Sequence, residues 1–470
     1  MKKVFCAIML VLLIAGSAYA QATFSLTGSY WAEGKYWFNY NADPGTDAAY
    51  NENSFGFYEQ DINLFPKISI GNTSLNFAIA ITDTYWGAAV ADTTEGITQD
   101  DPIGGEDDDI QIERAFISHK FGDKLTLDVG LMDGTQWGTT FADDKQAKWR
   151  VKATAFTPVG VIGAVLEKNK DRGAFSTGDD VPDNFEGEDS DAYGLFAVTE
   201  AGSVYIKTLL WYVRNQHIFM DKTADLSALG AVIPDPLLTD DADLEALLED
   251  VDLNLFNPVL AFNGDLGALS FEAEFNYKMW EIEGGTGNVD EDWDTYGIYV
   301  NIWKALDAMT PGFVAAYGSY DEDLMDAANA ALAAGNYQAF ITLNGVAANA
   351  AFDFEDDFNS TVILGDEYCW GGPGDDLQGM TLLKLYVNDI KTGMDPLTLS
   401  AYAAYVMSNQ DDTLYEDATA WELSLGAAYK ITDNLVYSVY GAYADINYDV
   451  TGVDDPDAVY MIANAIEFNF

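Results

Sequence analysis

Apolar and polar positions alternate over a long stretch near the start of the chain. Between Phe24 and Tyr40 the even positions carry aromatic, aliphatic or very small residues, while polar residues and two tryptophans occupy the odd positions. A period of two places successive side chains on opposite faces of a β-strand. The stretch is roughly three times as long as a usual strand of about 5–6 residues. It therefore predicts a strand with one continuous apolar face, longer than a soluble sheet needs.

The same alternation recurs along the chain, most clearly at 269–279 and 421–431. The direction of 110–121 stays open, because its apolar residues do not separate cleanly onto one face. We delimit about eighteen strands, at 22–40, 54–70, 73–85, 110–121, 124–133, 147–157, 159–168, 190–199, 203–215, 251–263, 268–282, 294–303, 313–320, 378–391, 397–408, 419–431, 435–445 and 458–470.

Tight turns and long polar loops alternate strictly between these strands. Pairs such as Gly71-Asn72, Gly122-Asp123 and Gly264-Asp265 mark the tight turns, and 304–312 is the loosest of them. This alternation is typical of transmembrane barrels, in which short periplasmic turns face long external loops. We expect the long loops near 41–53, 86–109, 134–146, 169–189, 216–250, 283–293, 321–377, 409–418 and 446–457.

A membrane also explains the length of the first strand. In hydrocarbon every backbone N–H and C=O must be paired within the protein, so a β-chain crosses only as a closed barrel. The distance from Phe24 to Tyr36 projects to about 30 Å along the membrane normal, close to the ~25 Å apolar band of such barrels. We therefore predict an all-β fold, a closed antiparallel up-and-down transmembrane β-barrel of about 16–18 strands.

The first twenty residues have the pattern of a secretory signal peptide. Lys2-Lys3 precede an apolar run, and Ala18-Tyr19-Ala20 places small residues at the positions that a signal peptidase reads. We expect cleavage near Ala20, so that 1–20 is the signal peptide and 21–470 is the transmembrane barrel.

The composition is strongly acidic, with 77 acidic residues against 22 basic ones and a formal net charge of −55. Such a chain repels nucleic acid, which we exclude as a partner. Apolar residues make up 49% and aromatic residues 14% of the chain, which argues against a disordered acidic segment. The composition indicates a folded β-protein with an acidic surface.

The last strand ends on an aromatic residue. One face of it carries Tyr460, Ile462, Ile466, Phe468 and Phe470, and Asn464 interrupts that face. This pattern resembles the closing strand of Gram-negative outer-membrane barrels, whose terminal aromatic is read by the barrel-assembly machinery. The resemblance implies that Phe470, Phe468 and Ile466 form the assembly signal.

Together with the signal peptide and the loop alternation, the whole chain resembles the porin superfamily, most closely the trimeric general-diffusion porins. The resemblance implies a homotrimer in the outer membrane of a Gram-negative bacterium, in contact with membrane lipid and lipopolysaccharide. It also implies passive diffusion of small hydrophilic solutes and ions through a water-filled channel.

Catalytic patterns are hard to find in the sequence. His119 and His217 are its only histidines, and neither has a partner at metal-ligand spacing. No phosphate-binding Gly-Lys-Ser/Thr loop and no Gly-x-Ser-x-Gly motif occurs. We expect no enzyme, no cofactor and no metal site. The acidic cluster at 105–109 lacks the spacing of a calcium loop and favours loosely held divalent cations at the external loops.

A basic ladder is the main candidate for the pore. Lys148, Arg150 and Lys152 alternate with apolar neighbours on one predicted strand. A charge facing lipid at mid-depth costs about 2–4 kcal/mol, which favours the lumen for all three. Arg114 is expected to join them from a nearby strand. The alternative is a position near the rim, where these cations would pair with lipopolysaccharide phosphates.

In the porins that the chain resembles, carboxylates of an infolded loop face such a basic ladder, and the resemblance implies the same arrangement here. Asp143 and Asp144, in the loop at 134–146, are the candidate constriction carboxylates. The loop at 321–377 is the better candidate for narrowing the pore, because it is long and has apolar stretches. Its segment 323–335 is expected to be helical, as is 238–250 in another long loop.

Further acidic residues on the predicted lumen face are Glu272, Glu274 and Glu422. Together with the acidic loops they are expected to raise the local concentration of cations near the pore mouth. We therefore predict a weak cation preference, which the basic ladder limits.

Three functions fit these patterns. The leading one is a porin for passive diffusion of small hydrophilic solutes. The second is a substrate-specific channel on the same barrel, for sugars, carboxylates or phosphate. The third, from another class, is a secreted acidic β-rich adhesin or glycan-binding protein, which would be extracted without detergent.

Overall fold

The computed structural model describes part of the chain. These residues are 22–39, 54–85, 110–134, 136–143, 145–170, 190–214, 251–284, 289–336, 339–340, 343, 346–354, 358, 361–364, 379–410, 418–447 and 458–470. The predicted signal peptide at 1–20, the loops at 41–53 and 86–109 and the helix predicted at 238–250 lie outside them.

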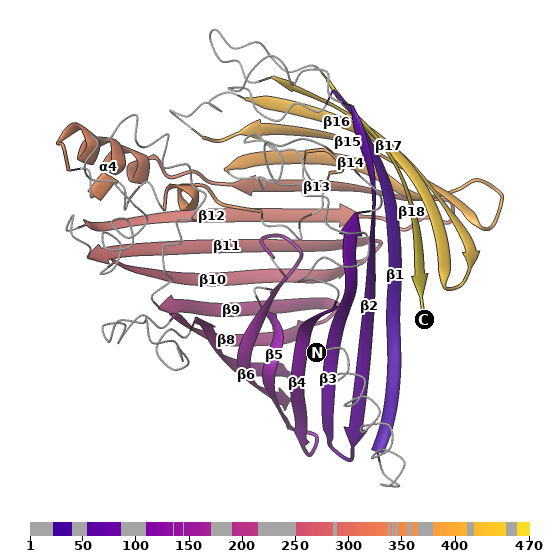
Figure 1. Cartoon of the computed structure of the whole chain (residues 1–470), viewed down its shortest axis with the longest axis horizontal. Coiled ribbons are helices and arrows are strands. Elements are labelled where there is room, and N and C mark those ends of the chain that lie inside the picture. The colour runs from indigo at the N-terminus through magenta and orange to yellow at the C-terminus, as the bar shows by residue number, and fades with distance from the viewer. Residues whose placement is uncertain are drawn as a thin grey trace.

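Eighteen strands of the described residues form one antiparallel sheet (Figure 1). Their bounds are β1 (Ala22–Phe38), β2 (Phe55–Ile70), β3 (Thr73–Tyr85), β4 (Ile110–Phe121), β5 (Leu125–Gly134), β6 (Gln146–Thr157), β7 (Gly160–Lys170), β8 (Ser190–Ala201), β9 (Val204–Arg214), β10 (Val251–Leu266), β11 (Leu269–Gly284), β12 (Val289–Trp303), β13 (Thr310–Gly318), β14 (Met380–Lys391), β15 (Leu397–Ser408), β16 (Thr419–Thr432), β17 (Leu435–Asn447) and β18 (Val459–Asn469).

The sheet closes on itself. Each strand pairs with its neighbours in the chain, and β1 pairs with both β2 and β18. At the closing seam Tyr30 lies opposite Phe468, and Phe38 lies opposite Tyr460. The predicted all-β, closed up-and-down barrel is therefore confirmed, with eighteen strands.

Two connections on β10–β12 differ from the prediction. The turn after β10 lies at 267–268, where Gly267 has a left-handed φ of 71°, and not at Gly264-Asp265. The connection predicted at 283–293 is shorter than expected, because β11 continues to Gly284 and β12 begins at Val289. Both strands carry outward acidic pairs at this end, such as Glu281 opposite Asp292. A strand that extends beyond the apolar band has no need of apolar outward side chains, and here the polarity of the two faces is reversed, with Trp280 and Ile282 buried on the inner face.

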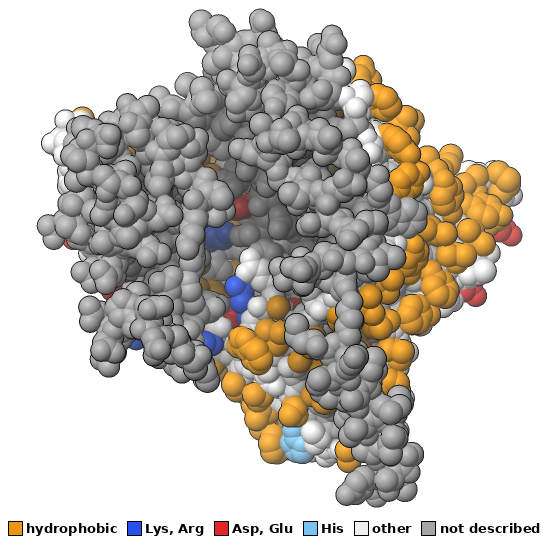
Figure 2. Space-filling model, viewed as in Figure 1, with side chains coloured by type: hydrophobic (Ala, Val, Ile, Leu, Met, Phe, Trp, Pro, Cys, Tyr) orange, Lys and Arg blue, Asp and Glu red, His pale blue; other side chains and the backbone are white. Residues whose placement is uncertain are grey.

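The two faces of the wall differ as the alternation predicted. On β1 the side chains of Phe24 and Tyr36 are exposed on the outer face, whereas Trp37 is buried inside. Trp149 on β6 is 61% exposed between two cations that face inward. Figure 2 shows hydrophobic side chains covering the outer surface at the right, with Lys, Arg, Asp and Glu side chains together in a hollow near the centre.

One helix, α4 (Glu322–Ala333), confirms the helix expected at 323–335. Asp321 caps it by accepting a hydrogen bond from the Asp323 backbone N–H at 3.0 Å. A short 3₁₀ turn, η1 (Ala347–Ala350), follows, and the Asp321 N–H donates to the Ala350 carbonyl at 2.8 Å. In Figure 1, α4 lies beside the ends of β11–β13 at which the long connections occur. No helix in the described part of the chain is long and apolar enough to cross a membrane.

Candidate functional site

Two segments between strands enter the barrel and shape its interior. The first, 136–143, connects β5 with β6 but is fixed to the wall at β9–β11. Glu274 of β11 accepts hydrogen bonds from the Thr139 backbone N–H at 2.7 Å and from the Thr139 hydroxyl at 2.9 Å. Lys207 of β9 donates to the Gly138 carbonyl at 2.6 Å. This first inner segment therefore crosses from its own strands to another part of the wall.

The second inner segment, described at 346–354, 358 and 361–364, lies between β13 and β14. Its aromatic side chains surround Phe141 of the first segment, with ring centroids 5.5 Å away for Phe352, 5.1 Å for Phe354 and 5.4 Å for Phe358. The Ala142 N–H also donates to the Phe354 carbonyl at 3.0 Å. The two segments thus meet inside the barrel and form one packed unit.

A cavity of about 420 Å³ remains beside this unit. Lys148, Arg150 and Lys152 of β6 line it together. Lys278 of β11 lines the same cavity from another part of the wall. We missed Lys278 as a site residue, although it alternates with Tyr277 and Met279 and the same pattern points it inward.

Each of three cavity cations lies against an aromatic ring. The Arg150 guanidinium is 5.6 Å from the Trp211 ring, and the Lys152 ammonium is 5.6 Å from the Phe196 ring. Lys278 is 4.9 Å from the Phe352 ring of the second inner segment. Contact with an aromatic face favours a cation without neutralising it, so these rings hold the charges in place at the cavity wall.

The four cations differ in how far they are neutralised. Arg150 forms an ion pair with Glu167, whose carboxylate is almost fully buried, and it also donates to the Asp133 carbonyl. Lys148 and Lys152 form no ion pair with any residue that the structure describes. The ladder thus contains two ammonium groups whose charge no described carboxylate balances directly.

Carboxylates also reach the cavity. Asp143, predicted as a constriction residue, lines it and accepts a hydrogen bond from the Trp137 backbone N–H at 2.7 Å. Asp353 of the second inner segment lines it as well, and nothing in the local sequence pattern marked this residue. Asp144, the other predicted carboxylate, lies outside the described residues.

Arg114 is separate from the ladder. It forms an ion pair with Asp133 at 2.6 Å, lies 5.6 Å from the Phe65 ring and is not part of the cavity lining. Its two contacts thus hold Arg114 against Asp133 of β5 and Phe65 of β2, outside the cavity that the β6 cations line.

Glu272, Glu274 and Glu422 face inward, but they bind protein groups there. Glu272 accepts from the Tyr299 hydroxyl at 2.6 Å and from the Asn301 amide at 3.1 Å. Glu274 and Glu422 are 3% and 0% exposed, because the two inner segments cover them. Alternation predicted their direction, but it carries no information about a segment that arrives from elsewhere in the chain.

The predicted assembly residues lie at the closing seam. Phe470 exchanges two backbone hydrogen bonds with Gly28 of β1, at 2.9 and 3.0 Å, and stacks on Phe468 with centroids 5.6 Å apart. Ile466 lies opposite Ala32 of β1.

Nothing in the described part of the chain has the arrangement of a metal site. No group of three or more His, Cys, Asp or Glu residues converges there. His119 instead shares a hydrogen bond of 2.8 Å with the Thr73 hydroxyl and packs edge-on against Phe121. His217 and the acidic cluster at 105–109 lie outside the described residues.

No protein-family model and no curated protein matches the sequence. Solved structures do match the fold. OccAB3 of Acinetobacter baumannii has a TM-score of 0.51 and 11% identity, covering 95% of this chain and 99% of that one. A BenF-like porin from Pseudomonas fluorescens Pf-5 has a TM-score of 0.51 and 10% identity, covering 95% and 98%. OccK9 (OpdG) of Pseudomonas aeruginosa has a TM-score of 0.50 and 12% identity, covering 95% and 99%. The chain therefore has the fold of the Gram-negative outer-membrane porins, here a closed antiparallel barrel of eighteen strands.

Proposed function

We propose that the chain forms a water-filled channel in the outer membrane for passive diffusion of small hydrophilic solutes, with small organic anions preferred. The observation that carries this proposal is the cavity beside the inner segments, with its four cations on β6 and β11. An apolar outer face is what a bilayer demands of such a barrel, and the exposed apolar side chains of the strands meet that demand.

Electrostatics supports the preference for anions. The cavity is lined by four cations and three carboxylates, and one of those carboxylates, Glu167, is engaged by Arg150. Lys148 and Lys152 have no carboxylate partner among the described residues. A narrow site with low-dielectric walls focuses such charge and raises the local concentration of ions of opposite sign. The electrostatic energy of a carboxylate or phosphate group is thus lowered in this cavity, whereas that of an ammonium group is raised.

A second candidate is a general-diffusion porin with a weak cation preference. The net charge of −55 favours it, because acidic residues around a pore mouth attract cations. The two candidates differ in which charge decides permeation, that of the whole surface or that of the cavity.

Proteoliposome swelling with three solutes of matched size separates them. We expect gluconate to enter faster than glucose, and glucose faster than glucosamine. The double variant Lys148→Gln/Lys152→Gln should lower the gluconate rate by about threefold or more, because it removes the focused positive charge. Lys304→Gln, an exposed cation at the β12 end and outside the cavity lining, serves as the matched control. Equal rates for the three solutes, or a lead for glucosamine, would favour the second candidate.

The proposal includes the oligomeric state and the partners of the channel. We expect a homotrimer that contacts outer-membrane lipid and lipopolysaccharide and is inserted by the barrel-assembly machinery through its C-terminal strand. We expect no catalytic activity and no cofactor, apart from divalent cations held loosely at the acidic external loops. Release of the protein by high salt or chelator, without detergent, would instead favour the adhesin or glycan-binding alternative.

A further inference from the structure

One carboxylate of the wall holds the second inner segment by its backbone. Glu422 of β16 accepts hydrogen bonds from three consecutive N–H groups. They come from Val362 at 2.9 Å, from Ile363 at 3.1 and 3.2 Å to the two oxygens, and from Leu364 at 2.9 Å. The Tyr402 hydroxyl of β15 completes the arrangement, because it donates to Glu422 and accepts from the Val362 N–H at 2.6 Å.

Consecutive backbone N–H groups that converge on one point form a concave anion site. Here the anion is a side chain of the barrel itself, and it is fully buried. A carboxylate offers two oxygens and acceptor sites only, so it can satisfy all three N–H groups and the Tyr402 hydroxyl together. An amide or an apolar side chain in its place would leave buried donors without partners, at the full cost of their desolvation.

The segment that Glu422 holds fills one side of the barrel interior. Ile363, Leu364 and Phe358 are buried in a cluster with inward side chains of the wall, among them Val406, Ala420, Ala442 and Met461 of β15–β18. The cavity with the basic ladder is lined instead from β6 to β11 and by the inner segments themselves. The position of the second segment therefore confines the open space to one side.

We propose that Glu422 is the positioning residue that holds the second inner segment against β16 and thereby sets the open cross-section of the channel. This inference rests on the proposed channel function. In the proposed channel Glu422 touches no solute and acts only through the second inner segment, which it anchors.

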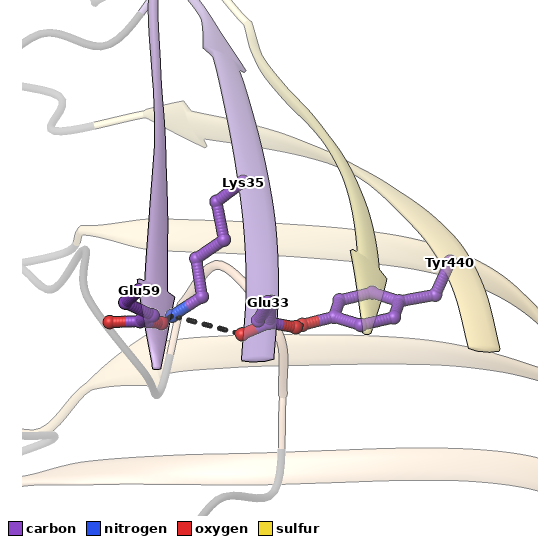
Figure 3. A network of polar contacts seen from close by, with 4 residues as sticks. All are labelled: Glu33, Lys35, Glu59 and Tyr440. Carbon is purple, nitrogen blue, oxygen red and sulfur yellow. Dashed lines mark hydrogen bonds and ion pairs between the residues drawn. The ribbon is translucent and has the colours of Figure 1, made fainter. Parts of the chain in front are cut away.

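A matched control carboxylate lies in the wall at the closing seam. Glu33 of β1 is also buried, accepts from the Tyr440 hydroxyl of β17 and lies 3.6 Å from the Lys35 ammonium, which in turn lies 3.3 Å from Glu59 of β2 (Figure 3). These partners all belong to strands of the wall. Loss of the Glu33 charge therefore tests removal of a buried carboxylate without removal of the Glu422 anchor.

The test is single-channel conductance of Glu422→Gln, Tyr402→Phe and Glu33→Gln in planar bilayers, with pore size measured by exclusion of polyethylene glycols of graded mass. Glu422→Gln should raise the conductance by about twofold or more and admit larger glycols, because the freed segment no longer occupies its side of the barrel. Tyr402→Phe, which keeps the carboxylate, should act in the same direction but less. Glu33→Gln should retain the wild-type conductance and size limit.

Folding is checked separately by the heat-dependent shift of the barrel in gel electrophoresis. If Glu422→Gln does not fold, Tyr402→Phe alone decides the matter. Wild-type conductance and size limit in a folded Glu422→Gln or Tyr402→Phe barrel would overturn the inference and leave the proposed function standing. A folded wild-type barrel without conductance would overturn the proposed function itself.

Discussion

At the scale of single residues, the three ladder cations are not equivalent. Arg150 forms an ion pair with Glu167, donates a hydrogen bond to a backbone carbonyl and lies against Trp211. Groups of the wall therefore largely balance its charge. Lys148 and Lys152 have no ion-pair partner among the described residues. Arg150 is thus placed to hold the wall together, and we propose that the two lysines act on a solute.

This difference predicts that Arg150→Ala destabilises the barrel. Truncation would leave the Glu167 carboxylate buried without its partner, which costs about 3 kcal/mol of unfolding free energy. Equilibrium unfolding in guanidinium measures the loss. The double variant Arg150→Ala/Glu167→Ala is the control and should be less destabilised than Arg150→Ala alone. Equal losses in the two variants would show that the pair is not the cause.

Sequence alone predicts the direction of such residues but not their partners. Alternation on β6 placed Lys148, Arg150 and Lys152 on one face, and the cavity contains all three. Which carboxylate meets Arg150 depends on the register of β6 against β7, where Arg150 lies opposite Glu167. Arg114 shows the limit most clearly, since nothing in its local sequence predicts its ion pair with Asp133 or its position outside the cavity lining.

At the scale of elements, the first inner segment depends on an unusual backbone position. Gly138 has a left-handed φ of 88°, and a Cβ there would lie 2.9 Å from the Ala261 side chain and against the Glu274 carboxylate. Only glycine gives the segment both this turn and this close approach to β10 and β11.

We therefore expect Gly138→Ala to displace the first inner segment, whose Asp143 lines the cavity. The backbone strain is of the order of 1–3 kcal/mol, and the steric overlap adds to it. The measurements are thermal unfolding and the noise of the open-channel current, which should increase as the segment moves. Gly202→Ala is the matched control, because Gly202 also has a left-handed φ, 69°, but a Cβ there meets nothing within 4 Å. Similar current noise in the two variants would contradict the role of the segment.

Strands were predictable at this scale, whereas the inner segments were not. A period of two survives in a strand that separates lipid from the barrel interior, so β3 and β15 begin and end as predicted. A connection that folds inward has no such period. Phe141 is fully buried by contacts with residues more than two hundred positions away, and nothing in its local sequence distinguishes it from an exposed loop residue.

At the scale of the whole molecule, closure joins the two ends of the described barrel. Phe470 and Gly28 exchange backbone hydrogen bonds, and Phe468 lies opposite Tyr30. The closing strand is thus the element without which β1 would keep an open edge, and an open edge is not tolerated in hydrocarbon.

We expect Phe470→Ala to lower the amount of folded, heat-modifiable protein in the outer membrane, because it removes the aromatic that we propose the assembly machinery reads. Cell fractionation followed by gel electrophoresis without heating measures this amount. Phe313→Ala on β13, another outward aromatic, is the control and should assemble at the wild-type level. Equal assembly of both variants would refute the role of Phe470 as an assembly signal.

The charge of the whole molecule and the charge of its cavity favour permeating ions of opposite sign. The chain carries a net charge of −55, yet the cavity has more cations than carboxylates in its lining. Ions that pass through a narrow site respond most strongly to the charges at that site, since salt screens distant ones within about 8–10 Å.

The most direct measurement is the reversal potential of single channels under a KCl gradient, for the wild type and for Lys148→Gln/Lys152→Gln. We expect the wild-type reversal potential to have the sign of chloride preference and to shift toward cation preference in the double variant. A cation-preferring wild type whose reversal potential the double variant leaves unchanged would contradict the proposed anion preference, and a folded barrel that passes no current would contradict the proposed channel.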